Sequence, residues 1–238
     1  MKEKLAELIY KTLSGRIYNP LMMINIKPVP LVLKNTDKCL VIAPHPDDES
    51  IGCGGIISLH PGNFDVLCLT HGAQEDIRFK EMHSAMDFAG VKNLMMLNLP
   101  DKNVLTGQAE FNKIDISRYD YIFMPFMFDQ HKDHKAASLL LYNRLKSGCR
   151  FKKSLKILFY EVWAALHMPQ YYIDITAAVN SKISMINFHK SQIISKDYAS
   201  KIIGLNQYRG LLKNISAAEC FAGMDCKDFM KTVSAVLC

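Results

Sequence analysis

Short apolar runs that alternate with longer amphipathic stretches are the feature that most restricts how this chain can fold. From about residue 39, apolar runs at 39–44, 65–70, 94–100, 121–126 and 155–162 are separated by segments that carry helical periodicity or turn signals. Strands that alternate with helices in this way predict βαβ units, and therefore a sheet of parallel strands with helices on both faces. We predict an α/β, Rossmann-like, doubly wound fold with a mostly parallel sheet.

A single domain is expected from the length of the chain. Its 238 residues, of which 49% are hydrophobic, suffice for one core. No repeat, linker or low-complexity tract divides the chain, so we assign residues 39–238 to one domain. Residues 1–38 are predicted to be an N-terminal extension, a helix followed by an irregular segment, because Pro20, Pro28 and Pro30 interrupt any longer periodicity.

Apolar runs, cysteines and charge indicate the expected cellular compartment and exclude some classes of partner. No stretch of about 18 apolar residues is present, and the start of the sequence does not open a signal peptide, so we expect a cytoplasmic protein without membrane insertion. Seven dispersed cysteines without a CxxC pair agree with reduced thiols. The net charge is +6, but the basic residues are scattered along the chain and do not predict nucleic-acid binding.

The first group of candidate functional residues follows the apolar run at 39–44. His45, Asp47, Asp48 and Glu49 stand almost side by side and precede the glycine-rich GCGG. Carboxylates crowded at the end of a strand repel one another, so a metal ion is the simplest stabilising partner. An acidic cap for the next helix is the plainer alternative. The glycines lack the G-x-G-x-x-G spacing of a dinucleotide site and more simply permit close helix packing.

The second group, DQHKDH at 129–134, follows the apolar run at 121–126 and opens the next predicted helix. His131 and His134 are three residues apart, so both imidazoles can face one side of a helix start and share a metal. Asp133 can hydrogen-bond one imidazole and fix its orientation. Surface histidines are the plainer alternative. However, both groups end strands of one parallel sheet, which is where ligand sites lie in such folds.

These two groups resemble the signature motifs of the PIG-L/LmbE-like N-deacetylase family. PHPDDE with GCGG matches the first motif, and D-x-H-x-D-H matches the second. The resemblance covers about residues 39–222 and implies the LmbE-like fold. Further matching positions are Arg78 and Glu81, the LNLPD that ends at Asp101, His189-Lys190-Ser191-Gln192 and Glu219-Cys220-Phe221.

The resemblance implies a zinc site in which His45, Asp48 and His134 bind the metal and Asp47 is the general base. Two imidazoles and one carboxylate leave a coordination position for water, as catalytic zinc requires. The same donors accept Fe2+ or another divalent metal.

Further roles follow from the same resemblance. His131 matches the family's catalytic histidine, with Asp133 as its partner, and Arg78 and Asp101 match positions that contact the sugar in relatives. Lys102 departs from the family, in which glycine is common after the Pro-Asp pair. We therefore expect the substrate loop near Lys102 to differ from that of relatives.

The expected activity is the zinc-dependent hydrolytic removal of an N-acetyl group from an amino-sugar conjugate of the N-acetylglucosamine type. One alternative is another metallohydrolase such as a phosphoesterase, which would need a second metal. The other is a non-catalytic sugar- or nucleotide-binding module. Loops select the group attached to the sugar, and one sequence does not identify it. The resemblance also implies homo-oligomers. Trp163, the only tryptophan, is suited either to stacking on a sugar ring or to packing.

Overall fold

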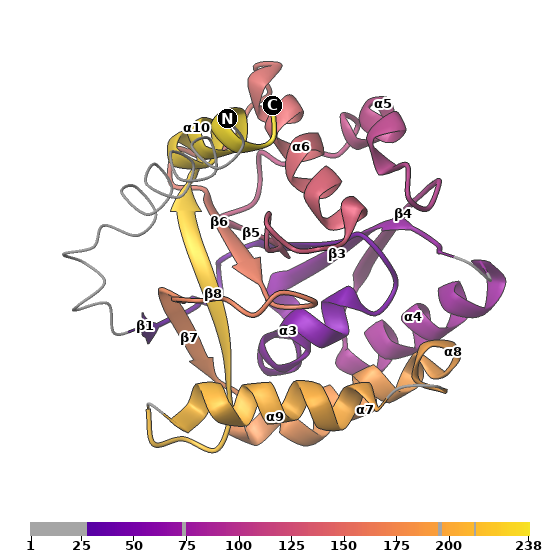
Figure 1. The fold of residues 1–238 in the computed structure, drawn as a ribbon, viewed down its shortest axis with the longest axis vertical. Coiled ribbons are helices and arrows are strands. Elements are labelled where there is room, and N and C mark those ends of the chain that lie inside the picture. Colours follow the sequence, from indigo (N-terminus) through magenta and orange to yellow (C-terminus); the bar gives the residue numbers. More distant parts are fainter. Residues whose placement is uncertain (1–27, 73–74, 195–196, 212) are drawn as a thin grey trace, which may run out of the picture.

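A computed structural model describes residues 28–72, 75–194, 197–211 and 213–238 of the chain. Within these residues one eight-stranded sheet lies between two layers of helices, which confirms the predicted α/β fold with a mostly parallel sheet (Figure 1). The strand order is β1-β7-β8-β6-β5-β2-β3-β4. The strands are β1 (Val29–Pro30), β2 (Cys39–Ala43), β3 (Phe64–Thr70), β4 (Asn93–Leu99), β5 (Tyr121–Pro125), β6 (Lys156–Tyr160), β7 (Tyr171–Asp174) and β8 (Ala218–Asp225).

Helices cover both faces of the sheet. On one face α3 packs against α7, α7 packs against α4 and α9, and on the other face α6 packs against α5 and α10 (Figure 1). The helices are α3 (Asp48–Leu59), α4 (Glu75–Ala89), α5 (Gln108–Phe111), α6 (Lys132–Lys146), α7 (Val179–Phe188), α8 (Lys190–Ile193), α9 (Tyr198–Leu211) and α10 (Cys226–Val236). No helix in the described part of the chain is both long and apolar enough to span a bilayer.

Strand β2 is the centre of the fold. It is buried along its whole length, and successive side chains point to opposite faces, so that Val41 joins the core under α3 and Leu40 joins the core under α6. It pairs in parallel with β3 on one side and with β5 on the other. After β2 the chain therefore continues to β3 on one side of β2 and returns later to form β5 on the other side. This is the topological switch point at which α/β sheets bind ligands.

The C-terminal part of the sheet contains elements that the sequence analysis did not predict. Strand β8 runs antiparallel between β6 and β7, and α10 follows it directly. The segment 218–225 has no β-branched residue and includes Glu219 and Gly223, so it lacks the composition typical of a buried strand. Its position in the sheet is set by tertiary pairing on both sides.

Residues before position 39 also take part in the fold. The short strand β1 pairs in parallel with β7, and Leu31 and Leu33 are buried in the core. The helix that we expected near the start of the extension falls on residues that the structure does not describe. The division of the chain at residue 38 stays a prediction.

The glycines of α3 allow close packing, as the sequence analysis expected. A Cβ atom on Gly52 would lie 2.1 Å from Cδ2 of Tyr160, whose hydroxyl donates a hydrogen bond to the Ile42 carbonyl oxygen. At Gly55 the backbone N–H instead donates to Oε1 of Glu219 on β8, at 2.7 Å. That carboxylate also accepts from Nζ of the buried Lys182. Glycine therefore lets α3 lie directly against its neighbours.

The substitution Gly52→Ala should destabilise the fold, because the new methyl group would overlap the ring of Tyr160. We expect a loss of about 1–3 kcal/mol in the free energy of unfolding, the usual cost of overpacking a core. Gly204→Ala in α9 is the matched control, since a Cβ there meets nothing within 4 Å and alanine favours a helix by about 0.5–1 kcal/mol. Urea unfolding of both variants measures the difference. Equal stabilities would contradict the packing argument.

Candidate functional site

The two predicted groups of site residues meet at the switch point between β2 and β5. His45 and Asp48 follow the carboxyl end of β2, and His131 and His134 follow the carboxyl end of β5. The ring centroids of His45 and His131 are 4.5 Å apart, and those of His45 and His134 are 5.5 Å apart. The structure therefore brings the two predicted groups together at one end of the sheet.

Asp47 adopts a strained backbone conformation at the start of α3. Its φ is 125° and its ψ is −29°, a region that costs a non-glycine residue about 1–3 kcal/mol. The surrounding structure holds it there, because its N–H donates to Oε2 of Glu49 at 3.1 Å and its carbonyl oxygen accepts from the N–H of Ile51. The carboxylate is thus fixed next to Asp48, the first residue of α3.

Arg78, which the sequence analysis expected to contact the sugar, is buried behind Asp47. Its Nη2 donates to the carbonyl oxygen of Pro46 at 2.6 Å and lies 3.4 Å from Oδ2 of Asp47. Gly72 takes a φ of +66° and lies so close that a Cβ there would be 2.3 Å from Nη1 of Arg78. This guanidinium therefore orients Asp47 in the structure, and a contact with substrate stays a prediction.

A second buried cluster supports Asp47 from below. His189, in the turn between α7 and α8, lies with its Nε2 3.2 Å from Oε1 of Glu49, and the Ser50 hydroxyl donates to the same oxygen at 2.7 Å. The other oxygen of Glu49 accepts the Asp47 N–H. All three side chains are buried. The imidazole of His189 therefore stabilises a carboxylate that in turn fixes the backbone of Asp47.

The hydrogen bonds of His45 determine which of its nitrogens can bind a metal. Its Nε2 lies 3.1 Å from Oδ2 of Asp133 and 3.3 Å from Oδ1 of Asp101. If a metal binds, the acceptor at Nε2 keeps a ring proton there, and Nδ1 is the nitrogen that can bind the metal. That Nδ1 is 3.3 Å from Oδ2 of Asp48.

His134 shows the same pattern with the two nitrogens exchanged. Its Nδ1 lies 3.2 Å from Oδ2 of Asp129, and its Nε2 lies 3.2 Å from Oδ2 of Asp48. The side chain is 0% exposed, and neither ring nitrogen makes a hydrogen bond of normal geometry. A buried imidazole nitrogen in this state, with a carboxylate behind the other nitrogen, is the usual arrangement of a metal ligand.

His131 differs from the other two histidines. It caps α6, and its Nδ1 accepts the N–H of Asp133 at 3.2 Å, so the proton of the neutral ring lies on Nε2. A protonated Nε2 donates hydrogen bonds and offers no lone pair. The carboxylate of Asp133, which we expected to orient His131, instead contacts His45 and accepts the N–H of Lys102. Only the backbone of Asp133 contacts His131.

Neighbouring carboxylates raise the pKa values of three site residues. Burial would lower the pKa of His45, but hydrogen bonds to Asp133 and Asp48 raise it to about 10. Burial also acts to lower the pKa of His134, but Asp48 and Asp129 raise it to about 9. Burial and the charge of Asp48 raise the pKa of Asp47 to about 7, against the opposing effect of Arg78. The carboxylates thus attract positive charge to this point.

Two sets of described residues have the spacing of a metal site. The ligand atoms of His45, His131 and His134 all lie within 4.8 Å of one another, and so do those of His45, Asp101 and Asp133. The proton on Nε2 of His131 argues against the first set. Oδ2 of Asp48 lies 3.3 Å from Nδ1 of His45 and 3.2 Å from Nε2 of His134, close to the about 3.4 Å that separates two ligand atoms of one zinc ion. That a metal displaces the protons of these two nitrogens and binds to His45, Asp48 and His134 stays a prediction.

The loop after β4 forms the rim of the site. Asp101 is 34% exposed and lies against His45, as expected for a residue that reaches a substrate. Lys102 has a φ of 62°, a left-handed conformation that favours glycine, and its N–H donates to Asp133. Lys102 stands where the family resemblance leads us to expect glycine. The left-handed conformation there lets its backbone N–H reach the carboxylate of Asp133.

Three site residues have no role assigned from the sequence alone. Asp129 accepts the backbone N–H of His131 and that of Trp163, and also contacts His134. The position of Asp129 directly before the HxxH pair was the available signal. Glu49 and His189 lie in family-like motifs, but their contact joins residues 140 positions apart, which no local pattern reveals.

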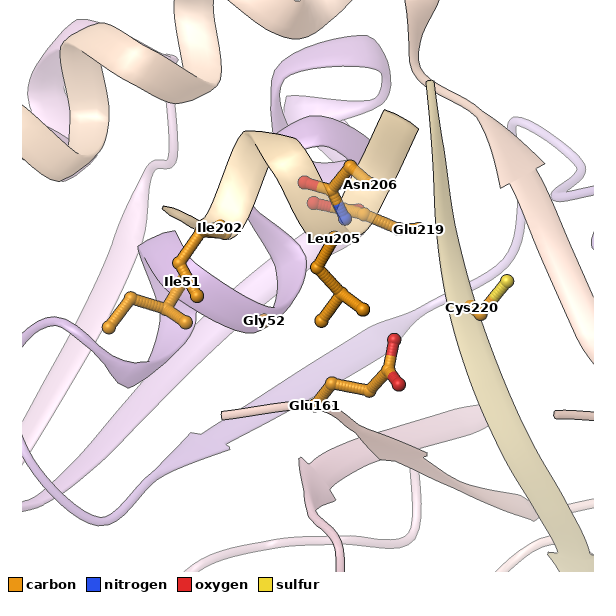
Figure 2. A pocket seen from close by; sticks show the side chains of 8 residues that line it. All are labelled: Ile51, Gly52, Glu161, Ile202, Leu205, Asn206, Glu219 and Cys220. Carbon is orange, nitrogen blue, oxygen red and sulfur yellow. The ribbon is translucent and has the colours of Figure 1, made fainter. Parts of the chain in front are cut away.

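A small cavity behind α3 is separate from this site. Figure 2 shows its wall, formed by α3, α9, β8 and the end of β6. Its volume is about 10 Å³, close to that of one water molecule, so it is too small for a sugar. Its lining residues are Ile51, Gly52, Glu161, Ile202, Leu205, Asn206, Glu219 and Cys220.

Comparison with known proteins agrees with this site. Residues 40–144, which contain both groups, match the family model PIG-L, described as GlcNAc-PI de-N-acetylase. A diacetylchitobiose deacetylase from Thermococcus kodakarensis is 27% identical over 190 residues, which cover 65% of this chain and 70% of that protein.

Solved structures share the fold. The conserved protein TT1542 from Thermus thermophilus has a TM-score of 0.68 and 24% identity, covering 78% of this chain and 93% of its own. The N,N'-diacetylchitobiose deacetylase from Pyrococcus horikoshii has a TM-score of 0.66 and 22% identity, covering 94% and 93%. A 4-carboxy-2-hydroxymuconate hydratase from Pseudomonas putida has a TM-score of 0.64 and 16% identity, covering 79% and 96%.

Replacing His189 by alanine should destabilise the protein, because it leaves the buried Glu49 carboxylate without its imidazole partner. We expect a loss of about 3 kcal/mol in the free energy of unfolding, as for other broken buried pairs. Lys152→Ala is the control, since its pair with Asp120 is partly exposed and contributes about 1 kcal/mol or less. Denaturant unfolding of both variants tests this. Similar losses in the two variants would contradict the role given to His189.

Proposed function

We propose that the chain, whose residues 40–144 match the PIG-L model of de-N-acetylases, is a metal-dependent hydrolase that removes the acetyl group from a sugar of the N-acetylglucosamine type. The observation that carries this proposal is the convergence of His45 Nδ1 and His134 Nε2 on Asp48, directly beside the strained Asp47. The amino-sugar substrate is supported by the related chitobiose deacetylases.

His45, Asp48 and His134 would hold the metal. Zinc suits these two nitrogen donors and one oxygen donor, and Fe2+ is the principal alternative. When bound, such an ion supplies Lewis-acid chemistry, which polarises an amide carbonyl and lowers the pKa of water to about 7. Asp133 and Asp129 orient the two imidazoles by accepting the proton of the opposite nitrogen.

Asp47 is the proposed general base. Its carboxylate is buried next to Asp48 and contacts Arg78, and Glu49 fixes its backbone by accepting the Asp47 N–H. In this position it can accept a proton from the attacking water. Removal of the amine requires a proton on nitrogen, and either Asp47 or His131 can deliver it.

His131 is proposed to stabilise the transition state. Because its Nδ1 is used by the Asp133 N–H, its Nε2–H remains as a donor for the oxygen that becomes negative when the amide carbonyl is attacked. Asp101, at the exposed rim, is proposed to accept a hydrogen bond from a sugar hydroxyl. Arg78 holds the carboxylate of Asp47, and its expected contact with the sugar would require a rearrangement of its side chain.

A phosphoesterase with two metals is the alternative that one observation favours. The set of His45, Asp101 and Asp133 has the spacing of a second site. Two metals would require His45 to bind one with each nitrogen and so to lose its ring proton. A single metal per chain separates the proposed deacetylase from this alternative.

Asp48→Ala and Asp47→Ala should separate metal binding from catalysis. We expect the purified protein to contain about one divalent metal per chain and to release acetate from N-acetylglucosamine conjugates in a chelator-sensitive way. Asp48→Ala should lose both metal and turnover, whereas Asp47→Ala should keep the metal and lose turnover by about 10²–10⁴-fold. Elemental analysis and acetate assays provide the measurements. Equal metal content in the two variants would refute these assignments, and two metals per chain would favour the phosphoesterase.

His131→Ala should keep the metal but slow turnover by about 10²–10³-fold, the cost of removing one transition-state donor. Gln130→Ala, at the exposed neighbouring position, is the matched control and should behave as the wild type. Metal content and kcat of both variants decide the matter. Loss of metal from His131→Ala would instead make His131 a ligand, in the set that includes His45 and His134.

A further inference from the structure

Glu81 on α4 and Ser191 on α8 form a contact that the proposed mechanism does not use. The backbone N–H of Ser191 donates to Oε1 of Glu81 at 2.7 Å, and its hydroxyl donates to Oε2 of the same carboxylate at 2.7 Å. The two residues are 110 positions apart in the sequence, and their contact joins two helices that lie side by side (Figure 1). One residue thus donates to both oxygens of a charged acceptor, which is a strong form of hydrogen bonding.

On the side of α4, the contact lies one helical turn from Arg78. Side chains three residues apart on a helix are neighbours on one face, so Arg78 and Glu81 point to the same side of α4. Nη2 of Arg78 donates to the carbonyl oxygen of Pro46 and lies 3.4 Å from Oδ2 of Asp47. The face of α4 that binds Ser191 therefore also contacts the carboxylate of Asp47.

On the side of α8, the contact lies two residues from His189. Nε2 of His189 is 3.2 Å from Oε1 of Glu49, and Oε2 of Glu49 accepts the N–H of Asp47 at 3.1 Å. Both His189 and Glu49 are buried. The turn that carries Ser191 therefore also fixes the backbone of Asp47.

Both routes end at Asp47, one at its carboxylate and one at its N–H, and the contact between Glu81 and Ser191 closes them into a ring. Among the hydrogen bonds of the residues that the structure describes, those from Ser191 are the ones that join α4 to the turn at 189–191. The φ of 125° at Asp47 is a strained conformation, which persists only while several contacts fix it. Because the ring is closed, a shift of one support of Asp47 is resisted by the other.

We propose that Glu81 and Ser191 are positioning residues for Asp47, which hold Arg78 and His189 at a fixed separation and so keep the carboxylate of Asp47 next to the proposed metal site. They act through Arg78 and His189 and not by contact with the substrate. The inference rests on the proposed deacetylase function, in which Asp47 is the general base. It extends the catalytic apparatus to two residues that the proposed mechanism leaves without a role.

Steady-state kinetics of the metal-loaded protein test this proposal. Glu81→Ala removes both hydrogen bonds and should lower kcat for acetate release about tenfold, since a misplacement of about 1 Å at a catalytic group can cost about 10²-fold. KM and metal content should stay close to those of the wild type, because the contact acts on the general base alone. Ser191→Ala keeps the backbone hydrogen bond and should have a smaller effect on kcat.

A double-mutant cycle separates positioning from a general loss of structure. Because Glu81 and Ser191 act on Asp47 through their mutual contact, the double variant should be no slower than Glu81→Ala alone, which is a non-additive result. Glu81→Gln should restore most of kcat, because a glutamine can still accept the N–H of Ser191 and donate to its hydroxyl. Asp87→Ala, at an exposed position of α4, and Ser184→Ala on α7 are the matched controls and should leave kcat unchanged.

Amide hydrogen exchange tests the same coupling without turnover. The N–H of Ile51 donates to the carbonyl oxygen of Asp47 at 2.9 Å, and the N–H of Asp47 donates to Glu49. In Glu81→Ala both amides should exchange about tenfold faster, because the open ring no longer resists local opening at Asp47. The amide of Val66 in the buried strand β3 should exchange as in the wild type.

Three results would overturn the proposal. The first is a Glu81→Ala variant with the kcat of the wild type or with unchanged exchange at Asp47 and Ile51. The second is a double variant whose loss of kcat equals the product of the two single losses, which would show that Glu81 and Ser191 act independently. The third is faster exchange at Val66 as well, which would show that the substitution destabilises the whole fold. Faster exchange confined to Asp47 and Ile51 in a protein that releases no acetate would support the coupling and reject the proposed function.

Discussion

The burial of three consecutive carboxyl groups at the end of β2 is the constraint on which the rest of the site depends. Asp47, Asp48 and Glu49 leave water together, and each needs its own compensation. The structure supplies it from three directions: Arg78 from α4 beside Asp47, two imidazoles beside Asp48, and His189 beside Glu49. Helices on one face of the sheet and a loop from β5 therefore have to be in place together. The strained backbone of Asp47 persists because contacts from several elements stabilise it.

The alternation of apolar runs was sufficient to predict the sheet, its mostly parallel character and the meeting of the two motifs. It could not predict β8, because Glu219 and Gly223 interrupt the apolar pattern and the strand is stabilised by neighbours on both sides. Among the site residues, the local motifs indicated His45, Asp47, Asp48 and the HxxH pair. They could not indicate which imidazole Asp133 orients, since this depends on where the loop after β4 brings Lys102 and on how the two strand ends face each other.

The fold alone would not identify the chemistry. A hydratase from Pseudomonas putida shares the architecture with a TM-score of 0.64, as the deacetylase from Pyrococcus horikoshii does with 0.66. What distinguishes candidate reactions is the protonation pattern of the imidazoles. In the proposed site His45 and His134 would offer the nitrogens that lie beside Asp48 to a cation, whereas His131, whose Nδ1 accepts a backbone N–H, would donate a hydrogen bond.

The position of β8 has a consequence for how the chain reaches its native state. Among the described strands, β7 and β1 join the rest of the sheet only through β8, which lies near the carboxyl terminus of the chain. The half of the sheet that carries the candidate site, β2 to β6, is complete by residue 160. During synthesis this half can begin to assemble while β1 and β7 still await their partner. The pairings of β8 join distant parts of the sequence, and the late closure of loops between them slows the final step of folding. Until β8 pairs with it, the outer edge of β6 has unpaired backbone N–H and C=O groups with which a strand of another chain can pair.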